Sequence, residues 1–185
     1  MKVRIIGSGT STGVPQIGCT CPVCTSTDPK DNRLRASAIV ETDDARILID
    51  CGPDFRTQVL RLPFEKIDGV LITHEHYDHI EGCSYLQMVY PNVKIIASEA
   101  CSKNIQDERW NLSRFVADNG VGFTVSAADI VIKKDISFQL IGLDFYFLLT
   151  PGHSLGSMCF FVENSFFSGD MLIPDEKVVL KLKGG

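Results

Sequence analysis

The stretch Val70-Leu71-Ile72-Thr73-His74-Glu75-His76-Tyr77-Asp78-His79 joins a short β-forming run to a dense cluster of potential metal ligands. Three of the four histidines in the chain lie in its last six residues. Imidazole and carboxylate groups are good ligands for zinc and related ions. Ordinary surface or core histidines explain this clustering poorly, because proteins mostly use histidine singly. The pattern therefore predicts a metal site.

These residues do not form the helical zinc motif His-Glu-x-x-His, in which both histidines come from consecutive turns of one helix. The position four residues after His74 is Asp78, not a histidine. The apolar residues before the motif instead place the ligands on the loop that follows a strand. The remaining histidine, His153, lies in a second compact segment, Pro151-Gly152-His153-Ser154.

Length and composition limit the class of protein. A chain of 185 residues can form one domain with a full core but not two large domains, so we expect residues 1–185 to be a single domain. The hydrophobic fraction of 44% and the charged fraction of 22% are ordinary for a soluble globular protein. The net charge of −5 argues against nucleic acid as the main partner.

Neither a membrane-spanning segment nor a signal peptide is expected from the sequence. No apolar run reaches the length of a membrane span, and Met1-Lys2-Val3-Arg4 lacks the apolar run of a signal peptide. The chain has seven cysteines, an odd number, and three of them are crowded together. This usage favours reduced thiols over a disulfide framework. We therefore expect a cytoplasmic protein without a membrane contact.

Cys19, Cys21 and Cys24 have the spacing C-x-C-x-x-C. Three thiolates can surround one tetrahedral zinc ion and leave one position for a ligand from elsewhere. Buried free cysteines are the alternative, but the charged residues nearby indicate an exposed loop, where free thiols tend to be oxidised. We expect a structural zinc here, although none of the four histidines is obviously free to be its fourth ligand.

A glycine-rich turn, residues 7–13, follows a short apolar strand predicted at residues 3–6. Backbone N–H groups and hydroxyls in such a turn can hold an anion. The spacing fits neither a Walker loop nor a dinucleotide-binding fingerprint. Two interpretations stay open, a tight strand-to-loop turn and a phosphate contact.

The rest of the chain alternates between strand and helix patterns. Further strands are expected at residues 38–41, 46–49, 67–73, 93–97, 136–141, 143–149, 157–162 and 166–168. Pro53 is expected to open a helix with an apolar face of Phe55, Val59, Leu60 and Leu62. Residues 80–89 have the length and apolar spacing of one helix.

Every candidate ligand lies just after the end of an expected strand. This holds for His74 to His79, for His153, and for Asp170 in the segment Ser168-Gly169-Asp170. Strand ends at one edge of a layered sheet are where a rigid scaffold can bring several loops to one point. We therefore expect these residues to converge.

The order strand-His-x-His-x-Asp-His, Gly-His loop, Ser-Gly-Asp resembles the metallo-β-lactamase fold superfamily. The resemblance implies an α/β protein, a four-layer αββα sandwich whose second half is incomplete in this chain. It also implies that His74, His76 and His153 hold a first metal ion, that Asp78 and His79 hold a second, and that Asp170 bridges them. Asp50 corresponds to an acid that orients a ligating histidine, although an aspartate of the turn or helix cap before Pro53 is an alternative.

A narrower resemblance lies at the N-terminus, where Gly13-Val14-Pro15 precedes the cysteines. This arrangement is similar to the cyclic phosphodiesterases of phosphonate degradation, which act on phosphoribosyl cyclic phosphate and carry a structural zinc. The glycine-rich turn is also similar to transfer-RNA 3′-processing endonucleases. Members of the superfamily continue past Ser-Gly-Asp to a last metal-binding histidine, whereas no histidine follows His153 here. We expect a C-terminally truncated form, with a natural short variant as the alternative.

The resemblance implies a metal-dependent hydrolase, most simply a phosphodiesterase in which a metal-bound hydroxide attacks a small cyclic phosphodiester. Two divalent ions, zinc or manganese, would form its centre, and Asp78 would orient the hydroxide. A small phosphorylated substrate is the expected partner, and uncovered apolar sheet surface would favour a homodimer. The alternatives are an ester, thioester or lactone hydrolase, a transfer-RNA processing endonuclease, and a metal-stabilised binding module without turnover.

Overall fold

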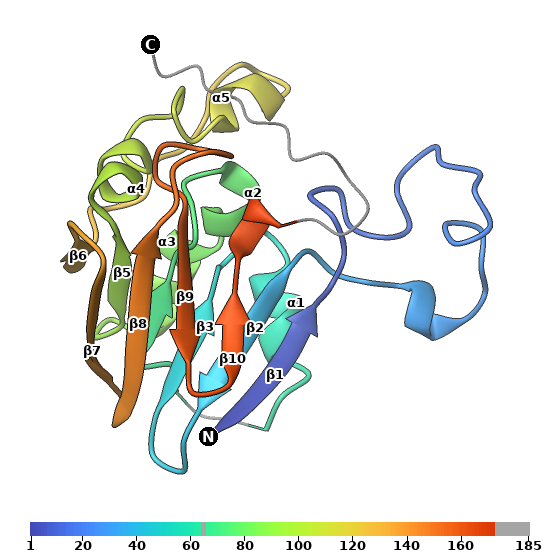
Figure 1. The fold of residues 1–185 in the computed structure, drawn as a ribbon. Helices are drawn as coiled ribbons and strands as arrows, with labels where there is room; N and C mark the ends of the chain where they lie inside the picture. Colours follow the sequence, from blue (N-terminus) through green and yellow to red (C-terminus); the bar gives the residue numbers. More distant parts are fainter. Residues whose placement is uncertain (64–65, 173–185) are drawn as a thin grey trace.

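The computed structural model describes residues 1–63 and 66–172, which form two β-sheets packed face to face (Figure 1). The first sheet has six strands in the order β1-β2-β3-β4-β5-β6, and the second has four in the order β10-β9-β8-β7. The strands are β1 (Lys2–Gly7), β2 (Ser37–Glu41), β3 (Arg46–Ile49), β4 (Gly69–Leu71), β5 (Lys94–Ser98), β6 (Ile130–Ile132), β7 (Ile136–Leu140), β8 (Leu143–Leu149), β9 (Met158–Val162) and β10 (Ser165–Phe167).

Strand direction changes inside the first sheet. Strands β1, β2 and β3 pair antiparallel, whereas β3, β4, β5 and β6 pair in parallel. The second sheet is an antiparallel meander from β7 to β10. Because β3, β4 and β5 run in the same direction, the loops that follow them meet at one edge of the first sheet. That edge carries Asp50 after β3 and His74 after β4.

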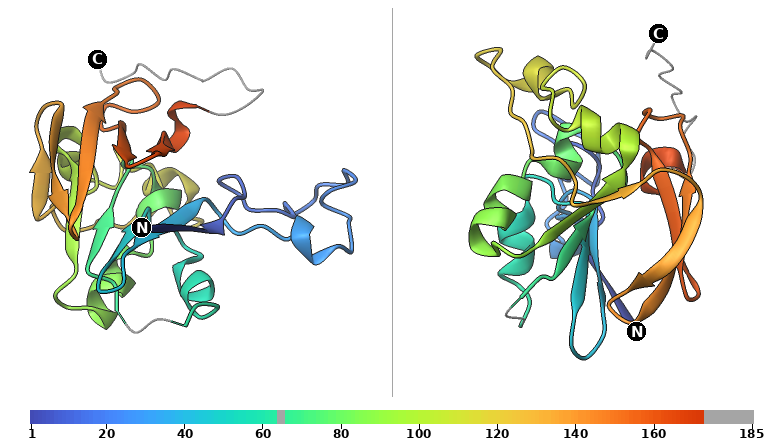
Figure 2. Two further views of the ribbon diagram at one scale, coloured as in Figure 1. Left: turned by 60° about the horizontal axis from the view of Figure 1, so that its bottom comes forward. Right: turned by 90° about the vertical axis from the view of Figure 1, so that its left-hand side faces the viewer.

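Short helices pack on the outer face of the first sheet (Figure 2). They are α1 (Phe55–Val59), α2 (Tyr77–Ile80), α3 (Cys83–Val89) and α4 (Glu99–Asn104). Outside this layer lie α5 (Ser113–Val116) and the 3-10 turns η1 (Pro29–Asp31) and η2 (Gly169–Met171). Val70 and Ile95 of the sheet pack there against Phe55, Leu86 and Ile105. In the described part of the chain, no helix is long and apolar enough to cross a membrane.

A second core fills the space between the two sheets. Alternation along a strand sends Leu71 and Ile96 to this side, while their neighbours face the helices. Phe160 meets them from the second sheet, with its ring centroid 6.0 Å from that of Phe145 and 5.9 Å from that of Phe147. Contact of the two sheets through these side chains sets the distance between the loops at their shared edge.

The outer face of the second sheet carries exposed aromatic side chains in the described part of the chain. Phe161 pairs across the sheet with Tyr146 and Phe166, and the three side chains are 40%, 45% and 43% exposed. No helix among residues 1–63 and 66–172 covers this face, so the described residues form three layers, helix–sheet–sheet. The expected αββα type of sandwich is confirmed in these layers.

Two helix predictions were wrong in detail. Residues 80–89 form two helices, because Gly82 N donates to Cys51 O at 2.8 Å and so leaves the helical hydrogen-bond pattern. Leu60 was expected on the buried face of the helix after Pro53, but it is 67% exposed. At about 100° per residue, Leu60 lies roughly 140° around the helix axis from the buried Phe55.

Candidate metal centre

Three segments bring the potential ligands to one edge of the first sheet. His74 and His76 follow β4 directly, and His79 lies in α2 immediately after them. His153 lies on the loop between β8 and β9, and Asp170 lies in η2 after β10. The expected convergence of loops from both sheets is therefore present in the structure.

The first ligand group consists of His74, His76 and His153, whose ligand atoms lie within 4.8 Å of one another. His153 Nε2 lies 3.0 Å from His76 Nδ1. The ring of His74 stands edge-on to both, with centroid distances of 4.6 Å to His76 and 4.8 Å to His153. Three ring nitrogens that face one point match the donor set of zinc sites.

The second ligand group consists of His74, His79 and Asp170, again within 4.8 Å of one another. Asp170 Oδ1 lies 3.5 Å from His79 Nε2, and Asp170 Oδ2 lies 3.8 Å from His153 Nε2. This carboxylate therefore lies between the two groups. Asp78 lies outside the 4.8 Å groups but keeps Oδ2 at 3.7 Å from His79 Nε2.

A test of whether these residues fit a metal ion comes from His74, which is 1% exposed and whose Nε2 has no hydrogen-bond partner in the described residues. Thr73 Oγ1 donates to Asp50 Oδ2 at 2.8 Å, so its oxygen accepts from His74 Nδ1 at 3.2 Å. His74 Nε2 then carries the free lone pair, and His74 belongs to both groups of neighbouring ligand atoms. A buried polar atom without a partner is costly, and a cation bound there would remove that cost. The donor set fits a divalent metal.

Asp50 contacts the segment that carries the ligands. Its backbone φ is +56°, which is uncommon for a residue other than glycine and typical of functional sites. The carboxylate accepts from Thr73 N at 2.7 Å and lies 2.8 Å from His79 Nδ1. It does not cap α1, whose N-cap is Asp54. The contact with Nδ1 turns His79 Nε2 towards Asp170.

Burial and charge set the protonation of the rings. Desolvation lowers the pKa of His74 well below its usual value and that of His76 to about 4, so both are neutral at pH 7 and can offer lone pairs. Burial also acts to lower the pKa of His79, but Asp50 and Asp170 raise it well above its usual value. The two carboxylates therefore favour a positive charge at this place.

Cys19, Cys21 and Cys24 lie together on a long loop that projects from the body of the molecule after β1 (Figure 1). Their sulfur atoms lie within 4.8 Å of one another. The backbone N–H of Cys24, together with the Cys19 thiol, lowers the pKa of Cys21 to about 7. Within the described ranges no fourth His, Cys, Asp or Glu joins this cysteine group. The three thiols fit a tetrahedral zinc ion with one further ligand.

A cavity of about 370 Å³ opens beside the second ligand group. Asp78, His79 and Asp170 line one side, and residues 8–11 of the glycine-rich turn line the other together with Arg35. A Cβ at Gly7 would collide with the carbonyl oxygen of Arg35, so glycine is required for this close approach. The turn is thus packed against the chain segment that carries Arg35.

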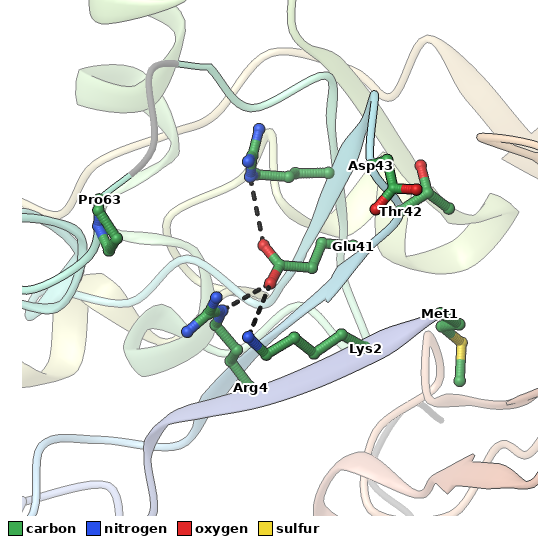
Figure 3. A pocket seen from close by; sticks show the side chains of 8 residues that line it. Met1, Lys2, Arg4, Glu41, Thr42, Asp43 and Pro63 are labelled. Carbon is green, nitrogen blue, oxygen red and sulfur yellow. Dashed lines mark hydrogen bonds and ion pairs between the residues drawn. The ribbon is translucent and has the colours of Figure 1, made fainter.

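A second cavity, of about 420 Å³, lies at the opposite edge of the first sheet (Figure 3). Its centre is Glu41, which is 8% exposed. Arg4 Nε lies 2.6 Å from Glu41 Oε1, Arg46 Nε lies 3.3 Å from Oε2, and Lys2 Nζ lies 3.8 Å from Oε1. These contacts tie β1, β2 and β3 together, and we assign the cluster a structural role.

This assignment predicts that Glu41→Gln lowers the free energy of unfolding by about 1–2 kcal/mol at pH 7. Burial acts to raise the pKa of Glu41, but the neighbouring cations lower it overall. With a depressed folded-state pKa, the carboxylate stabilises the fold above its unfolded-state pKa, and this contribution is lost as the pH falls through the folded-state pKa. Urea unfolding at pH 7 and pH 3 measures the difference, which should shrink in acid. A difference independent of pH would contradict the assignment.

Comparison with known proteins identifies the family. The model of the "Metallo-beta-lactamase superfamily" matches residues 32–185. The chain belongs to this superfamily. This match confirms the resemblance inferred from the histidine motif. Members of the superfamily are in general hydrolases that bind divalent metal ions.

Relatives in the superfamily carry several names. The chain is 39% identical over 146 residues to an octanoyltransferase of Porphyromonas gingivalis, covering 77% of this chain and 29% of that protein. It is 32% identical over 174 residues to coenzyme PQQ synthesis protein B of Methylorubrum populi, covering 84% of this chain and 50% of that protein. The chain thus spans half or less of the length of these curated relatives.

The chain covers a larger share of one solved structure, that of a new diphosphatase from the PhnP family. Its identity to this chain is 32% and its TM-score is 0.67, covering 89% of this chain and 62% of that chain. This likeness extends to the sequence, so it reaches beyond the shared fold.

Three residues near the ligands were not predicted from the sequence to take part in the site. Thr73 and Glu75 stand beside ligands in the motif, but the sequence does not show which residues their side chains contact. Arg35 lies in no motif at all. Its position beside the glycine-rich turn follows from the bridge between Gly9 and Arg35, which only the folded chain displays.

Proposed function

We propose that this chain hydrolyses a small cyclic phosphodiester, using two divalent ions, zinc or manganese, held by the two ligand groups. The observation that carries the proposal is the cavity in which residues 8–11 and Arg35 face Asp78, His79 and Asp170. Its volume of about 370 Å³ is in the range of sites for small molecules. The 32% identity to a PhnP-family diphosphatase supports a phosphate-containing substrate.

Arg35 lines this cavity and would contact an anionic substrate there. Arg35 Nε donates to Ser11 O at 2.8 Å, and Nη1 donates to Asp54 Oδ1 at 3.1 Å. These two contacts hold the guanidinium plane in place. They leave Nη2 without a hydrogen-bond partner among residues 1–63 and 66–172, so it is available to a phosphate oxygen. Hydroxyls of Ser8, Thr10 and Ser11 add further donors to the same cavity.

The ligand residues divide the work around the substrate. His74, His76 and His153 would hold one ion. His79, Asp78 and Asp170 would hold the other. Bound divalent ions supply Lewis acidity and lower the pKa of water. Asp78 is placed on the cavity wall, where its carboxylate can accept a hydrogen bond from the attacking water and orient it. Asp50 holds His79 in the required orientation.

The activity is tested with protein loaded with zinc or manganese. Bis(4-nitrophenyl) phosphate and a ribose cyclic phosphate are the expected substrates, and a thioester, a lactone and a transfer-RNA precursor are the comparison substrates. Turnover should be confined to the phosphodiesters and should be lost in His76→Ala. Turnover that is unchanged in His76→Ala, or confined to the thioester or lactone, would refute the proposal. Bound ions without turnover of any substrate would favour a binding module.

Substitution of Arg35 tests the substrate class separately. In Arg35→Gln, kcat/KM for the phosphodiester should fall about tenfold to a hundredfold, the contribution of one hydrogen bond to a charged group. Hydrolysis of an uncharged ester, if any occurs, should be unaffected. Arg33→Gln is the matched control, since Arg33 is exposed and does not line the cavity. Equal losses for charged and uncharged substrates would show that Arg35 acts on the fold alone.

A further inference from the structure

Glu75 is the one acidic residue of the central motif that the proposed metal centre does not use. It stands between His74 and His76, yet it is only 2% exposed. Its side chain belongs to neither ligand group and accepts hydrogen bonds from Asn104 Nδ2 at 2.8 Å and from Ser154 Oγ at 2.8 Å. Gly156 N is a third, longer donor at 3.4 Å.

These donors come from two other parts of the chain. Asn104 is the last residue of α4, and Ser154 and Gly156 belong to the loop that carries His153. A single carboxylate therefore joins the His74–His76 segment, a helix of the first sheet and the ligand loop of the second sheet. Ser154 is separated from Glu75 by 79 positions in the sequence.

The loop has little freedom around this contact. Ser154 N donates to Ser157 Oγ at 3.0 Å, and Ser98 Oγ donates to Gly156 O at 2.8 Å. A Cβ at Gly156 would collide with Glu75 Oε2 and would lie 2.6 Å from Cys101 Cα. Glycine is therefore needed at position 156 for the loop to approach the carboxylate so closely. Because His153 lies in the same loop, its position depends on this contact.

The surroundings of Glu75 are unusual for a buried acid. Among the described residues no Lys, Arg or His forms an ion pair with it, so neutral donors alone satisfy its oxygens. Burying a carboxylate without a cation costs several kcal/mol unless something else compensates. Divalent cations at the adjacent histidines would supply that compensation, and the negative charge would in turn strengthen their binding.

We propose that Glu75 is a positioning residue that fixes His153 relative to His74 and His76 and thereby sets the affinity of the first ligand group for its divalent ion. This inference rests on the proposed metal centre. Residues that hold metal ligands in place through hydrogen bonds commonly change metal affinity about tenfold to a hundredfold when replaced.

Glu75→Gln is the sharpest test, because glutamine keeps the volume but turns one acceptor into a donor that faces Asn104 or Ser154. We expect a tenfold to hundredfold weaker first ion. The double variant Glu75→Gln with Asn104→Asp reverses donor and acceptor and should regain part of the lost affinity. Glu99→Gln, an equal chemical change at an exposed residue of α4, is the matched control and should bind as wild type does.

The experiment is a Co²⁺ titration of the intact protein in competition with a chelator. The near-ultraviolet thiolate bands report the cysteine group, which serves as an internal reference. The visible d–d bands report the histidine groups once the contribution of the cysteine group has been subtracted. Circular dichroism checks that each variant is folded. Should Glu75→Gln fail to fold, Ser154→Ala removes one donor without disturbing the carboxylate and should weaken the first ion about three- to tenfold.

The outcomes separate this inference from the proposed function. Weaker binding at the histidines with unchanged thiolate bands supports a positioning role. Unchanged affinity in folded Glu75→Gln and Ser154→Ala would overturn that role and leave the metal centre standing. A wild-type protein that binds no Co²⁺ at its histidines would overturn the proposed function and this inference together.

Discussion

His74→Ala is expected to remove the ion of the first ligand group, to weaken the ion of the second, and to reduce phosphodiester turnover by about a thousandfold or more, which is about 4 kcal/mol in activation free energy. His74 is the residue that the two groups share. Its Nε2 is buried without a partner in the described part of the chain, and its tautomer is held by Thr73.

The comparison variant is His76→Ala, which should lose only the ion of the first ligand group, since His76 takes part in that group alone. Metal content per chain, measured by plasma mass spectrometry after dialysis, distinguishes the two variants. Zinc on the cysteine group should be the same in both and serves as the internal standard. Equal metal content in wild type and His74→Ala would contradict the shared position of this residue.

Phe160→Ala is expected to have the largest effect on stability, a loss of about 3–5 kcal/mol. The Phe160 ring is fully buried between the two sheets and lies near the rings of Phe145, Phe147 and Phe167. Its removal leaves a cavity in the layer that holds the sheets together. Because a domain is stable by only about 5–15 kcal/mol in all, such a loss would bring the protein close to unfolding.

Phe161→Ala is the matched control, the same chemical change one position along β9. Phe161 points to the opposite face and is 40% exposed, so its replacement should cost under about 1 kcal/mol. Guanidinium unfolding of both variants gives the two values. Similar losses for Phe160 and Phe161 would show that the packing of the two sheets does not depend on the side chains assigned to it.

Most strands were predicted from sequence because their signals are local. Residues 46–49 and 143–149 coincide with β3 and β8, as apolar runs bounded by turn residues. Helix boundaries were predicted less well. The break before α3 depends on a hydrogen bond from Gly82 to Cys51, which are 31 positions apart and whose pairing no local pattern reveals. Exposure of Leu60 likewise depends on which side of a short helix meets the sheet.

The ligand types were available from sequence for a similar reason. His74, His76, Asp78 and His79 stand within six consecutive residues, so their spacing alone indicates metal binding. The cysteine group is also local, and its three sulfur atoms lie within 4.8 Å of one another. The roles of Asp170 and His153 came from resemblance to a family, not from any feature of their own surroundings.

Residue pattern alone was thus sufficient for the six-residue motif and for the strand before it, because both depend on neighbours in the chain. Tertiary structure decided everything that joins distant segments. The 3.0 Å approach of His153 to His76 spans 77 positions, and the contact of Ser154 with Glu75 spans 79. Both contacts require the two sheets to be packed together through the phenylalanines between them, a three-dimensional fit of side chains that no spacing in a linear sequence encodes.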